Sequence, residues 1–288
     1  MSRSGIVSSA CLVAASVAAV LAGHPSRMAA AVNARAALSA HADLSSNWAG
    51  YVAIGFGSTA STASSAMSFT DVTGQWVQPK ASCAAGTPTS VAVWVGLGGY
   101  SESSQELEQA GTSADCSADG LASYYIWYEL VPSNSINLKL KIRPGDTIAA
   151  VVKISGSDVL VQVTDRTRKT RFTKHLRMAS PDLTSAEWIV EAPSQCGSDG
   201  LCSQIPLTNF HSVVFTRSFA IGNNVPGAIS SPTWTSTALQ LVPRASRFFG
   251  DPNQPATLGG AGAAPSALSQ DGSGFTATWQ ANPFAGGG

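Results

Sequence analysis

The stretch Val91-Ala92-Val93-Trp94-Val95 decides the fold class of this chain. Residues that are β-branched or aromatic dominate it, and such residues favour the pleated, half-buried surface of a β-strand. Further segments have the same character and are separated by clusters of Gly, Pro, Ser or Asp, which is typical of strands joined by turns. These segments are Tyr124–Leu130, Thr147–Ile154, Val159–Val163, Glu187–Glu191 and Val213–Phe215.

The rest of the chain supports an all-β fold. Arg143-Pro144-Gly145-Asp146 and Ser155-Gly156-Ser157-Asp158 are turn signals, and no long amphipathic helix is evident. Residues 250–267 are rich in Gly, Ala and Pro and predict a loop, after which Gly274–Trp279 alternates as a final strand. We therefore expect an antiparallel β-sandwich of two stacked sheets rather than a parallel α/β sheet.

Charge is scarce and balanced along the sequence. Charged residues make up 12% of the chain and the formal net charge is zero, whereas globular domains carry roughly 25% charged residues. Without clustered Lys and Arg the composition argues against a nucleic-acid partner. A surface of Ser, Thr, Asn and Gly loses few ion pairs when carboxylates are protonated in acid.

The amino-terminal region predicts export. Arg3 precedes the apolar run Ile6–Leu21, and small residues follow, so residues 1–30 are typical of a secretory signal peptide. The run is short for a membrane span, which needs about 20 apolar residues, so we expect a secreted protein without stable membrane insertion. We expect residues 31–43 to form a short segment, residues 44–281 the β domain, and residues 282–288 a flexible tail.

The cysteine count agrees with an oxidising environment. Cys11 lies in the predicted signal, which leaves four cysteines and three possible pairings. Cys196 and Cys202 flank Gly-Ser-Asp-Gly, which favours a local bridge and leaves Cys83 to pair with Cys116. The spacings do not form two Cys-x-x-Cys pairs and no histidine lies near, so a metal site is not predicted.

Two short stretches carry the chemistry: Leu107-Glu108-Gln109-Ala110-Gly111 and Ala186-Glu187-Trp188-Ile189-Val190-Glu191. Together they resemble the paired active-site segments of the eqolisin family, the glutamic peptidases. Other segments resemble the same family in the same order, namely Ser46–Tyr51, Val72–Pro79, Trp94–Gly99, Trp127–Glu129 and the loop between Cys196 and Cys202.

The resemblance implies a secreted acid endopeptidase with a concanavalin-like or jelly-roll sandwich, acting as a monomer on protein or peptide substrates. Its catalytic dyad falls on Gln109 and Glu191, and no metal or organic cofactor is required. Glu191 takes a proton from water and returns it to the leaving amine. Gln109 orients the water and donates to the oxyanion. The implied substrate-binding residues, which share a groove, are Trp48, Trp94, Trp127 and Glu129.

Strand periodicity supports a shared face independently of the resemblance. Successive side chains of a strand point to opposite sides, so Glu187 and Glu191 share one face while Trp188 takes the other. By the same rule Trp127 and Glu129 share a face, opposite Tyr128. A face that combines carboxylates with a large aromatic ring suits a concave binding surface.

Two positions depart from the family pattern, and two other functions stay open. Gly98 and Ala192 stand where the family carries Asp, so we expect altered specificity or pH dependence rather than lost chemistry. A β-sandwich glycoside hydrolase could use Glu129, Glu187 and Glu191, with Trp94 and Trp127 stacking on sugars. A non-catalytic carbohydrate- or peptide-binding module could use the same aromatic face. Gln109 discriminates, because a two-carboxylate sugar hydrolase gives it no necessary role.

Overall fold

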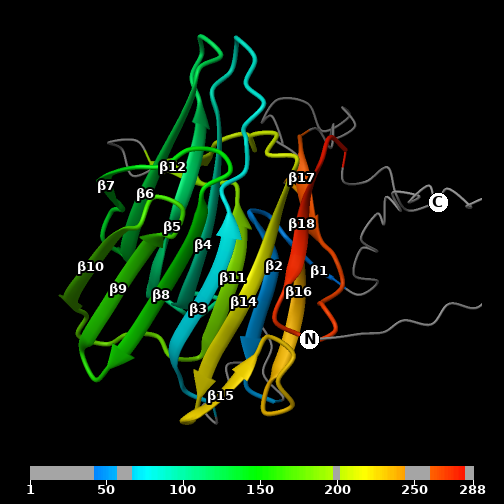
Figure 1. The fold of residues 1–288 in the computed structure, drawn as a ribbon. Coiled ribbons are helices and arrows are strands. Elements are labelled where there is room, and N and C mark those ends of the chain that lie inside the picture. Colours follow the sequence, from blue (N-terminus) through cyan, green and yellow to red (C-terminus); the bar gives the residue numbers. More distant parts are fainter. Residues whose placement is uncertain (1–41, 57–66, 197–201, 244–259, 283–288) are drawn as a thin grey trace, which may run out of the picture. The chain divides into compact units, whose positions relative to one another are not determined.

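The computed structural model describes residues 42–56, 67–196, 202–243 and 260–282. The chain divides into two compact units, residues 1–35 and 36–288, and every described residue belongs to the second. The predicted signal peptide and most of the segment 31–43 therefore lie outside the described residues. Within the described ranges all regular elements are strands (Figure 1), and no helix there is long and apolar enough to cross a membrane.

The strands of the described residues, in chain order, are β1 (Asp43–Ser45), β2 (Trp48–Ile54), β3 (Phe69–Val77), β4 (Thr89–Gly98), β5 (Leu107–Cys116), β6 (Ala122–Val131), β7 (Ile136–Lys141), β8 (Thr147–Ser155), β9 (Asp158–Asp165), β10 (Thr170–Arg177), β11 (Ser185–Glu191), β12 (Ser194–Cys196), β13 (Cys202–Gln204), β14 (Ser212–Gly222), β15 (Val225–Ala228), β16 (Thr235–Leu241), β17 (Gly262–Pro265) and β18 (Phe275–Gln280).

Hydrogen bonding joins most of these strands into one sheet. Its order is β10-β9-β8-β3-β14-β18-β17-β16-β2-β11-β4-β5-β6-β7, with β1 beside β16 and β15 beside β14, while β12 and β13 form a separate pair. The pairings are antiparallel except for β1 with β16. The all-β antiparallel prediction is confirmed. The expected division into two sheets is not, because one unbroken ladder joins the strands from β10 to β7, and β1 and β15 pair at its side to make a sheet of sixteen strands.

Period-two burial explains why these segments form strands. In β9 every second residue is buried, from Val159 to Asp165, so one face packs inward and the other meets solvent. All six segments predicted as strands lie in strands of the structure, and Gly274–Trp279 falls largely in β18. The loop predicted over 250–267 is wrong at Gly262–Pro265, where β17 pairs with β18 through backbone groups that need no large side chain.

The main core lies between strands that pack face to face. Strands β3 and β8 contact β4 and β5 across it (Figure 1), and large buried side chains such as Phe215 fill it. Two core tryptophans tie the layers together: Trp76 Nε1 donates to Thr112 Oγ1 at 3.0 Å, and Trp188 Nε1 donates to the Thr73 carbonyl at 2.8 Å. Each bond satisfies a buried donor that would otherwise cost free energy.

One predicted disulfide is present in the described residues. Cys83 and Cys116 are bonded, which confirms that pairing. The β12–β13 register places Cys196 opposite Cys202, and Cys202 is disulfide-bonded. The side chain of Cys196 lies outside the described residues, so the Cys196–Cys202 bridge stays a prediction.

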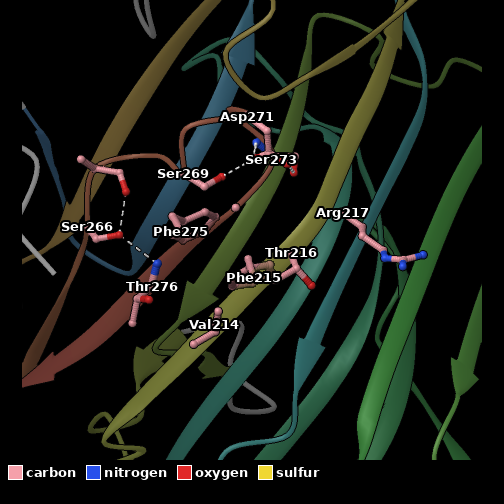
Figure 2. Close-up of a pocket in the computed structure, with 12 residues that line it drawn as sticks. Val214, Phe215, Thr216, Arg217, Ser266, Ser269, Asp271, Ser273, Phe275 and Thr276 are labelled. Atoms are coloured by element: carbon pink, nitrogen blue, oxygen red, sulfur yellow. Dashed lines mark hydrogen bonds between the residues drawn. The ribbon is translucent and has the colours of Figure 1, made fainter. Parts of the chain in front are cut away.

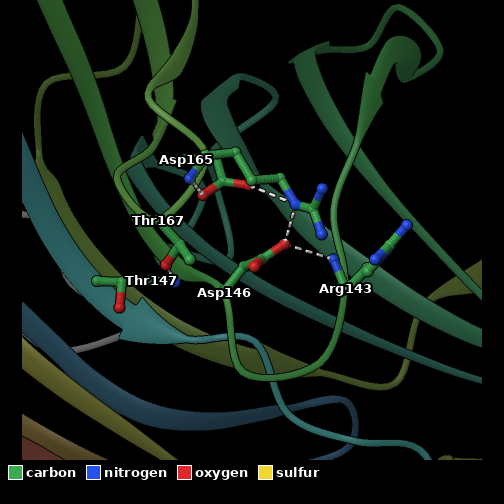
Figure 3. A network of polar contacts seen from close by, with 6 residues as sticks. Arg143, Asp146, Thr147, Asp165 and Thr167 are labelled. Carbon is green, nitrogen blue, oxygen red and sulfur yellow. Dashed lines mark hydrogen bonds and ion pairs between the residues drawn. The ribbon is translucent and has the colours of Figure 1, made fainter.

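An ionic network fixes one end of the β7–β10 strands. Arg168 Nε lies 2.7 Å from Asp146 Oδ2 and 3.5 Å from Asp165 Oδ2 (Figure 3). The same Asp146 oxygen accepts the Arg143 amide at 2.7 Å and so closes the predicted Arg143–Asp146 turn. This network joins the loop before β8 to the loop after β9, so we assign it a structural role.

Glu108 of β5 is a buried carboxyl on the core side of the sheet. It is fully buried and has the same strand parity as Ala110, which belongs to the main core. Burial, with the negative charges of Asp182 and Glu106, raises the pKa of Glu108 to about 8. No ion pair in the described part of the chain involves it, so the neutral acid is the form that the fold accommodates.

We expect the folded domain to lose stability as the pH rises from about 4.5 to about 8. Across this window folded Glu108 keeps a proton that the unfolded chain has released, because its pKa is raised from the ordinary 4.5 to about 8. The folded state therefore binds more protons, and the free energy of unfolding falls with pH. One pKa unit corresponds to about 1.4 kcal/mol, so the slope is large enough to measure by urea unfolding at several pH values.

Glu108→Gln tests the source of this slope. The amide resembles the neutral acid but does not titrate, so the variant's stability should depend less on pH between 5 and 8, whatever its absolute stability. A slope identical to that of the wild type would show that Glu108 does not cause it.

Candidate active site

A second apolar cluster lies on the sheet face opposite the main core, and we call this face the site face. It includes Trp94, Trp127 and Ile189, with Trp48 and Tyr125 packed against it. The register aligns three of these strands, because Ile189 pairs with Trp94, Trp94 with Gly111, and Gly111 with Trp127. Trp188 and Tyr128 belong to the main core instead. The predicted division of side chains between the two faces is therefore confirmed.

Trp94 sits at the centre of this face, and two glycines make room for it. A Cβ on Gly111 of β5 would lie 2.6 Å from Trp94 Cβ, and one on Gly96 of β4 would lie 2.9 Å from Trp94 Cζ3. Trp48 packs edge-on against the indole, with ring centroids 5.1 Å apart. The ring is thus fixed between β2 and β5, with one edge over Gly96.

Glu191, at the end of β11, receives two hydrogen bonds. Trp94 Nε1 donates to Oε2 at 2.8 Å, and Asn47 Nδ2 donates to Oε1 at 3.2 Å. Burial raises the pKa of Glu191 to about 7; the bond from Trp94 opposes this shift, while the charge of Glu129 adds to it. Glu191 is therefore a carboxyl that exchanges a proton far more readily near neutral pH than an ordinary glutamate does.

Gln109 and Glu129 form a cross-strand pair on the same face. They lie directly opposite each other in β5 and β6, and Gln109 Nε2 donates to Glu129 Oε2 at 2.7 Å. Gln109 is buried, and its Oε1 meets no donor among the described residues. Burial raises the pKa of Glu129, and the bond from Gln109 opposes the shift. The amide oxygen of Gln109 is thus a buried acceptor without a hydrogen-bond donor among the described residues.

The structure brings the predicted residues together in two groups. Trp48 and Trp94 surround Glu191, whereas Gln109 holds Glu129. Between the groups, the Trp94 ring reaches from Glu191 to Gly96, and a Cβ on Gly96 would lie 3.2 Å from Gln109 Cβ. The charge of Glu129 also raises the pKa of Glu191, so the groups are electrostatically linked.

A second glutamate, Glu187, occupies the same strand row as Gln109. Gly96 pairs with Gln109 on one side and with Glu187 on the other, whereas Glu191 pairs with Ala92, further along β4. Glu187 is fully buried, and burial, with the charges of Asp182 and Glu108, raises its pKa well above the ordinary value. Its position across a glycine from Gln109 follows from register, which local sequence patterns do not reveal.

Asp182 fills the space beside Gly98, where the resembled family carries an aspartate. Gly98 has a φ of +82°, and a Cβ there would lie 2.5 Å from Asp182 Cβ. The carboxylate of Asp182 accepts the Gly99 amide at 3.1 Å and the Ser104 hydroxyl. The departure at Gly98 therefore coincides with a carboxylate that the loop before β11 brings to the same place.

Gly98→Ala should destabilise the domain, by about 1–3 kcal/mol for a residue forced into the left-handed region against a close neighbour. Asp182→Gly removes the side-chain atoms that would lie 2.5 and 2.9 Å from the new Cβ, but it leaves the carbonyl oxygen of residue 182 at 2.8 Å. The double variant should therefore recover part of the loss due to Gly98→Ala, as a double-mutant cycle by chemical unfolding would show. Strictly additive effects would contradict the steric coupling between these two positions.

Two pockets of the described residues lie away from the Gln109–Glu129 pair. A pocket of about 430 Å³ lies beside β14 and β18, and its Asp271 carboxylate is satisfied by Ser269 and Ser273 (Figure 2). A second, of about 790 Å³, is lined by Asn47, Ala192 and Gln204 among others. Only the second adjoins the candidate site, through the Asn47 side chain that donates to Glu191.

Comparison with known proteins gives one family and two curated relatives. A model of the peptidase A4 family matches residues 46–240. Aspergillopepsin-2 of Aspergillus niger is 29% identical over 202 residues, which cover 62% of this chain and 65% of the relative. Scytalidopepsin B of Scytalidium lignicola is 30% identical over 179 residues, 60% of this chain and 62% of the relative. The chain thus spans somewhat under two thirds of the length of each curated relative.

Solved structures share the fold. The structure of scytalido-glutamic peptidase with a peptide-based transition state analog matches with a TM-score of 0.60 at 23% identity, over 81% of this chain and 98% of that chain. The structure of SCP-B, a member of the eqolisin family, in complex with the tripeptide Ala-Ile-His matches with a TM-score of 0.57 at 22% identity and the same coverage. These likenesses establish the architecture.

Proposed function

This chain belongs to the peptidase A4 family, and we propose that it is a secreted glutamic endopeptidase that hydrolyses peptide bonds with Gln109, Glu191 and an activated water. The observation that carries the proposal is the pair of hydrogen bonds that the carboxyl group of Glu191 accepts. This carboxyl has a pKa raised to about 7 and is held in place by two donors on the site face, Trp94 and Asn47.

Glu191 has the properties that a proton shuttle needs. A general base works best when its pKa lies near the working pH, and burial is a usual means of raising a glutamate to that range. In its ionised form Glu191 takes a proton from water as the oxygen attacks the scissile carbonyl carbon. The same proton then passes to the amide nitrogen as the carbon–nitrogen bond breaks, which restores the carboxylate.

Gln109 supplies the complementary groups. Its Oε1 is buried and has no protein donor in the described residues, and we assign it as the acceptor for the attacking water in the substrate complex. Its amide nitrogen, anchored by Glu129 at 2.7 Å, has a second N–H that can donate to the oxyanion. Donors that are already positioned stabilise developing charge without reorganisation, and losing one typically costs about 10²–10³ in rate.

Hydrogen bonding favours Glu191 over Glu187 as the partner of Gln109. Glu191 accepts hydrogen bonds from the indole of Trp94 and the amide of Asn47. Its pKa also responds to the charge of Glu129, the residue to which Gln109 is hydrogen-bonded. Glu187 lies in the row of Gln109, but it is fully buried and its pKa responds to the charges of Asp182 and Glu108. We therefore assign Glu187 a structural role beside the site and not a role in proton transfer.

The domain limits and export belong to the same proposal. The described strands extend from Asp43 to Gln280, which supports a domain over 44–281. The Cys83–Cys116 disulfide supports an oxidising compartment. We propose a monomer that acts on protein or peptide substrates in a weakly acidic extracellular medium.

Glu191→Gln should retain the fold and abolish turnover, because an amide cannot take a proton from water. Gln109→Ala should lower kcat by about 10²-fold or more through loss of the oxyanion donor. Cleavage of a denatured protein and of a quenched fluorescent peptide by the purified mature enzyme measures both effects, and circular dichroism checks the fold.

Glu187→Gln is the matched control on the same strand and face. It keeps a neutral side chain where burial already favours the protonated acid, so it should remain substantially active. Loss of activity in Glu187→Gln with normal activity in Glu191→Gln would transfer the catalytic role to Glu187. Full activity in Glu191→Gln would refute the dyad.

Replacing Asn47 should move the acid limb of the kcat/KM profile. Asn47→Ala removes a donor that stabilises the ionised form of Glu191, so the pKa of Glu191 rises and the limb shifts to higher pH. Asn47→Asp puts a carboxyl group beside Glu191, and its ionised form should shift the limb further in the same direction. Coincident limbs in the wild type and both variants would show that this limb does not report Glu191.

The wild-type profile also bears on the acid optimum. The family resemblance implies activity favoured in acid, whereas the ionised fraction of a group with a pKa of about 7 falls about tenfold for each pH unit below it. The two expectations differ below pH 6: a loss of activity that begins near pH 7 follows the ionisation of Glu191, whereas full activity near pH 4 would contradict Glu191 as a base with this pKa.

A further inference from the structure

The edge strand β7 places two lysines on the site face. Leu138 and Leu140 pack against the main core, so the alternating residues Lys139 and Lys141 project to the other side. The pairing agrees, because Asn137 lies opposite Trp127 and Lys141 opposite Tyr125, both of the site-face cluster. The register shift between these pairs inserts two residues, which preserves the alternation.

Both lysines are exposed, and neither takes part in an ion pair among the described residues. Lys141 lies at the level of Tyr125, in the row that continues through Ser113 and Ala92 to Glu191. The lysines therefore flank the candidate site on the side of Trp127 that is remote from Gln109.

The other titratable groups on this side are Glu191, Glu129, Asp115 and Tyr125, and none of the ion pairs of the described residues joins one of them to Lys139 or Lys141. Burial raises the pKa of Glu191 to about 7 and also raises the pKa of Glu129. Asp115 of β5 has the same parity as Gln109 and is bound by the Ser90 hydroxyl at 2.6 Å. Burial and the charge of Asp115 raise the pKa of Tyr125 to about 12, so its phenol is neutral.

We propose that Lys139 and Lys141 bind an acidic side chain of the peptide substrate on one side of the scissile bond. The inference rests on the proposed peptidase function and adds a substrate class to it: peptides that carry Asp or Glu where the chain passes β7. Two exposed ammonium groups that are close in sequence and have no ion-pair partner among the described residues suit a carboxylate, which accepts charge-assisted hydrogen bonds.

The alternative role for these lysines is protection of the edge strand β7, because charged side chains on edge strands prevent pairing with other chains. That role predicts no effect on substrate choice. The two roles therefore differ in whether the lysines change kcat/KM for acidic peptides. The pH separates them further, because the aspartate side chain of the substrate has an ordinary pKa of about 3.9 and loses its charge below it.

The experiment uses quenched fluorescent peptides that share one cleavable sequence and differ only by Asp or Asn at each position on either side of the bond. We expect the wild-type enzyme at pH 5.5 to prefer Asp at one or two adjacent positions by about tenfold in kcat/KM, mainly through KM. The preference should shrink towards unity at pH 3, where the substrate carboxyl is mostly protonated, and should weaken with added salt.

The variant Lys139→Glu/Lys141→Glu should abolish or invert the preference at pH 5.5 while it cleaves the Asn peptide within about twofold of the wild type. Arg166→Glu/Arg171→Glu is the matched control, because it makes the same change in net charge at exposed residues on and beside β10, the strand at the other end of the sheet order. It should keep the wild-type preference.

Each result decides the matter. No preference for Asp at any position at pH 5.5, or a preference that survives in the Lys139→Glu/Lys141→Glu variant, overturns the inference while leaving peptidase activity in place. Loss of the preference in the control variant as well overturns it too, because the effect would follow net charge. Failure of the wild-type enzyme to cleave the Asn or the Asp peptides overturns the proposed function itself.

Discussion

The hydrogen bond from Trp94 to Glu191 is the interaction on which the candidate site depends. Trp94 is fully buried, and a buried indole N–H needs an acceptor. The acceptor is a carboxylate oxygen at 2.8 Å, so the packing of the site face and the ionisation of Glu191 are coupled through one bond. Because Gly96 lies against the ring and Gly111 against the Trp94 Cβ, the indole has little freedom to move away from this carboxyl. The chemistry proposed for Glu191 thus follows from the need to satisfy a packed aromatic side chain.

Four carboxyls of β5, β6 and β11 divide into two kinds that share one cause of pKa change. Burial raises the pKa of all four, Glu108, Glu129, Glu187 and Glu191. Glu191 and Glu129 also receive side-chain hydrogen bonds, which keep their ionised forms accessible. Glu108 and Glu187 are fully buried beside further negative charge, which adds to the rise in the pKa of both. A chain with 12% charged residues can hold such groups in acid, since few ion pairs are lost there.

Local pattern was enough to predict the strands and the faces of their side chains. The period of two placed Trp127 opposite Tyr128 and Glu191 opposite Val190, and the two apolar clusters have the same division. Register was not predictable, because it depends on partners distant in sequence; the row from Glu187 through Gly96 to Gln109 is an example. The single continuous sheet is another, since it depends on pairings such as β3 with β14 that no local signal encodes. Asp182 reaches Gly98 from more than eighty residues away. The sequence alone does not reveal this contact and shows only that an aspartate is missing at position 98.

The proposed catalytic residues lie on central strands of the sheet, whereas the proposed substrate-binding lysines lie on an edge strand. Strands β4, β5 and β11 have a neighbour on both sides, so ladders of backbone hydrogen bonds fix the residues that bear Trp94, Gln109 and Glu191. Such central strands hold functional groups more rigidly than loops or edges do. Strand β7 has one neighbour and tolerates a two-residue irregularity without disturbing Leu138 or Leu140. Residues on its exposed face can therefore change with the substrate at little cost to the fold, while the central strands keep the proton-transfer groups in place. Differences in specificity among chains of this architecture are accordingly expected at β7 rather than at β4, β5 or β11.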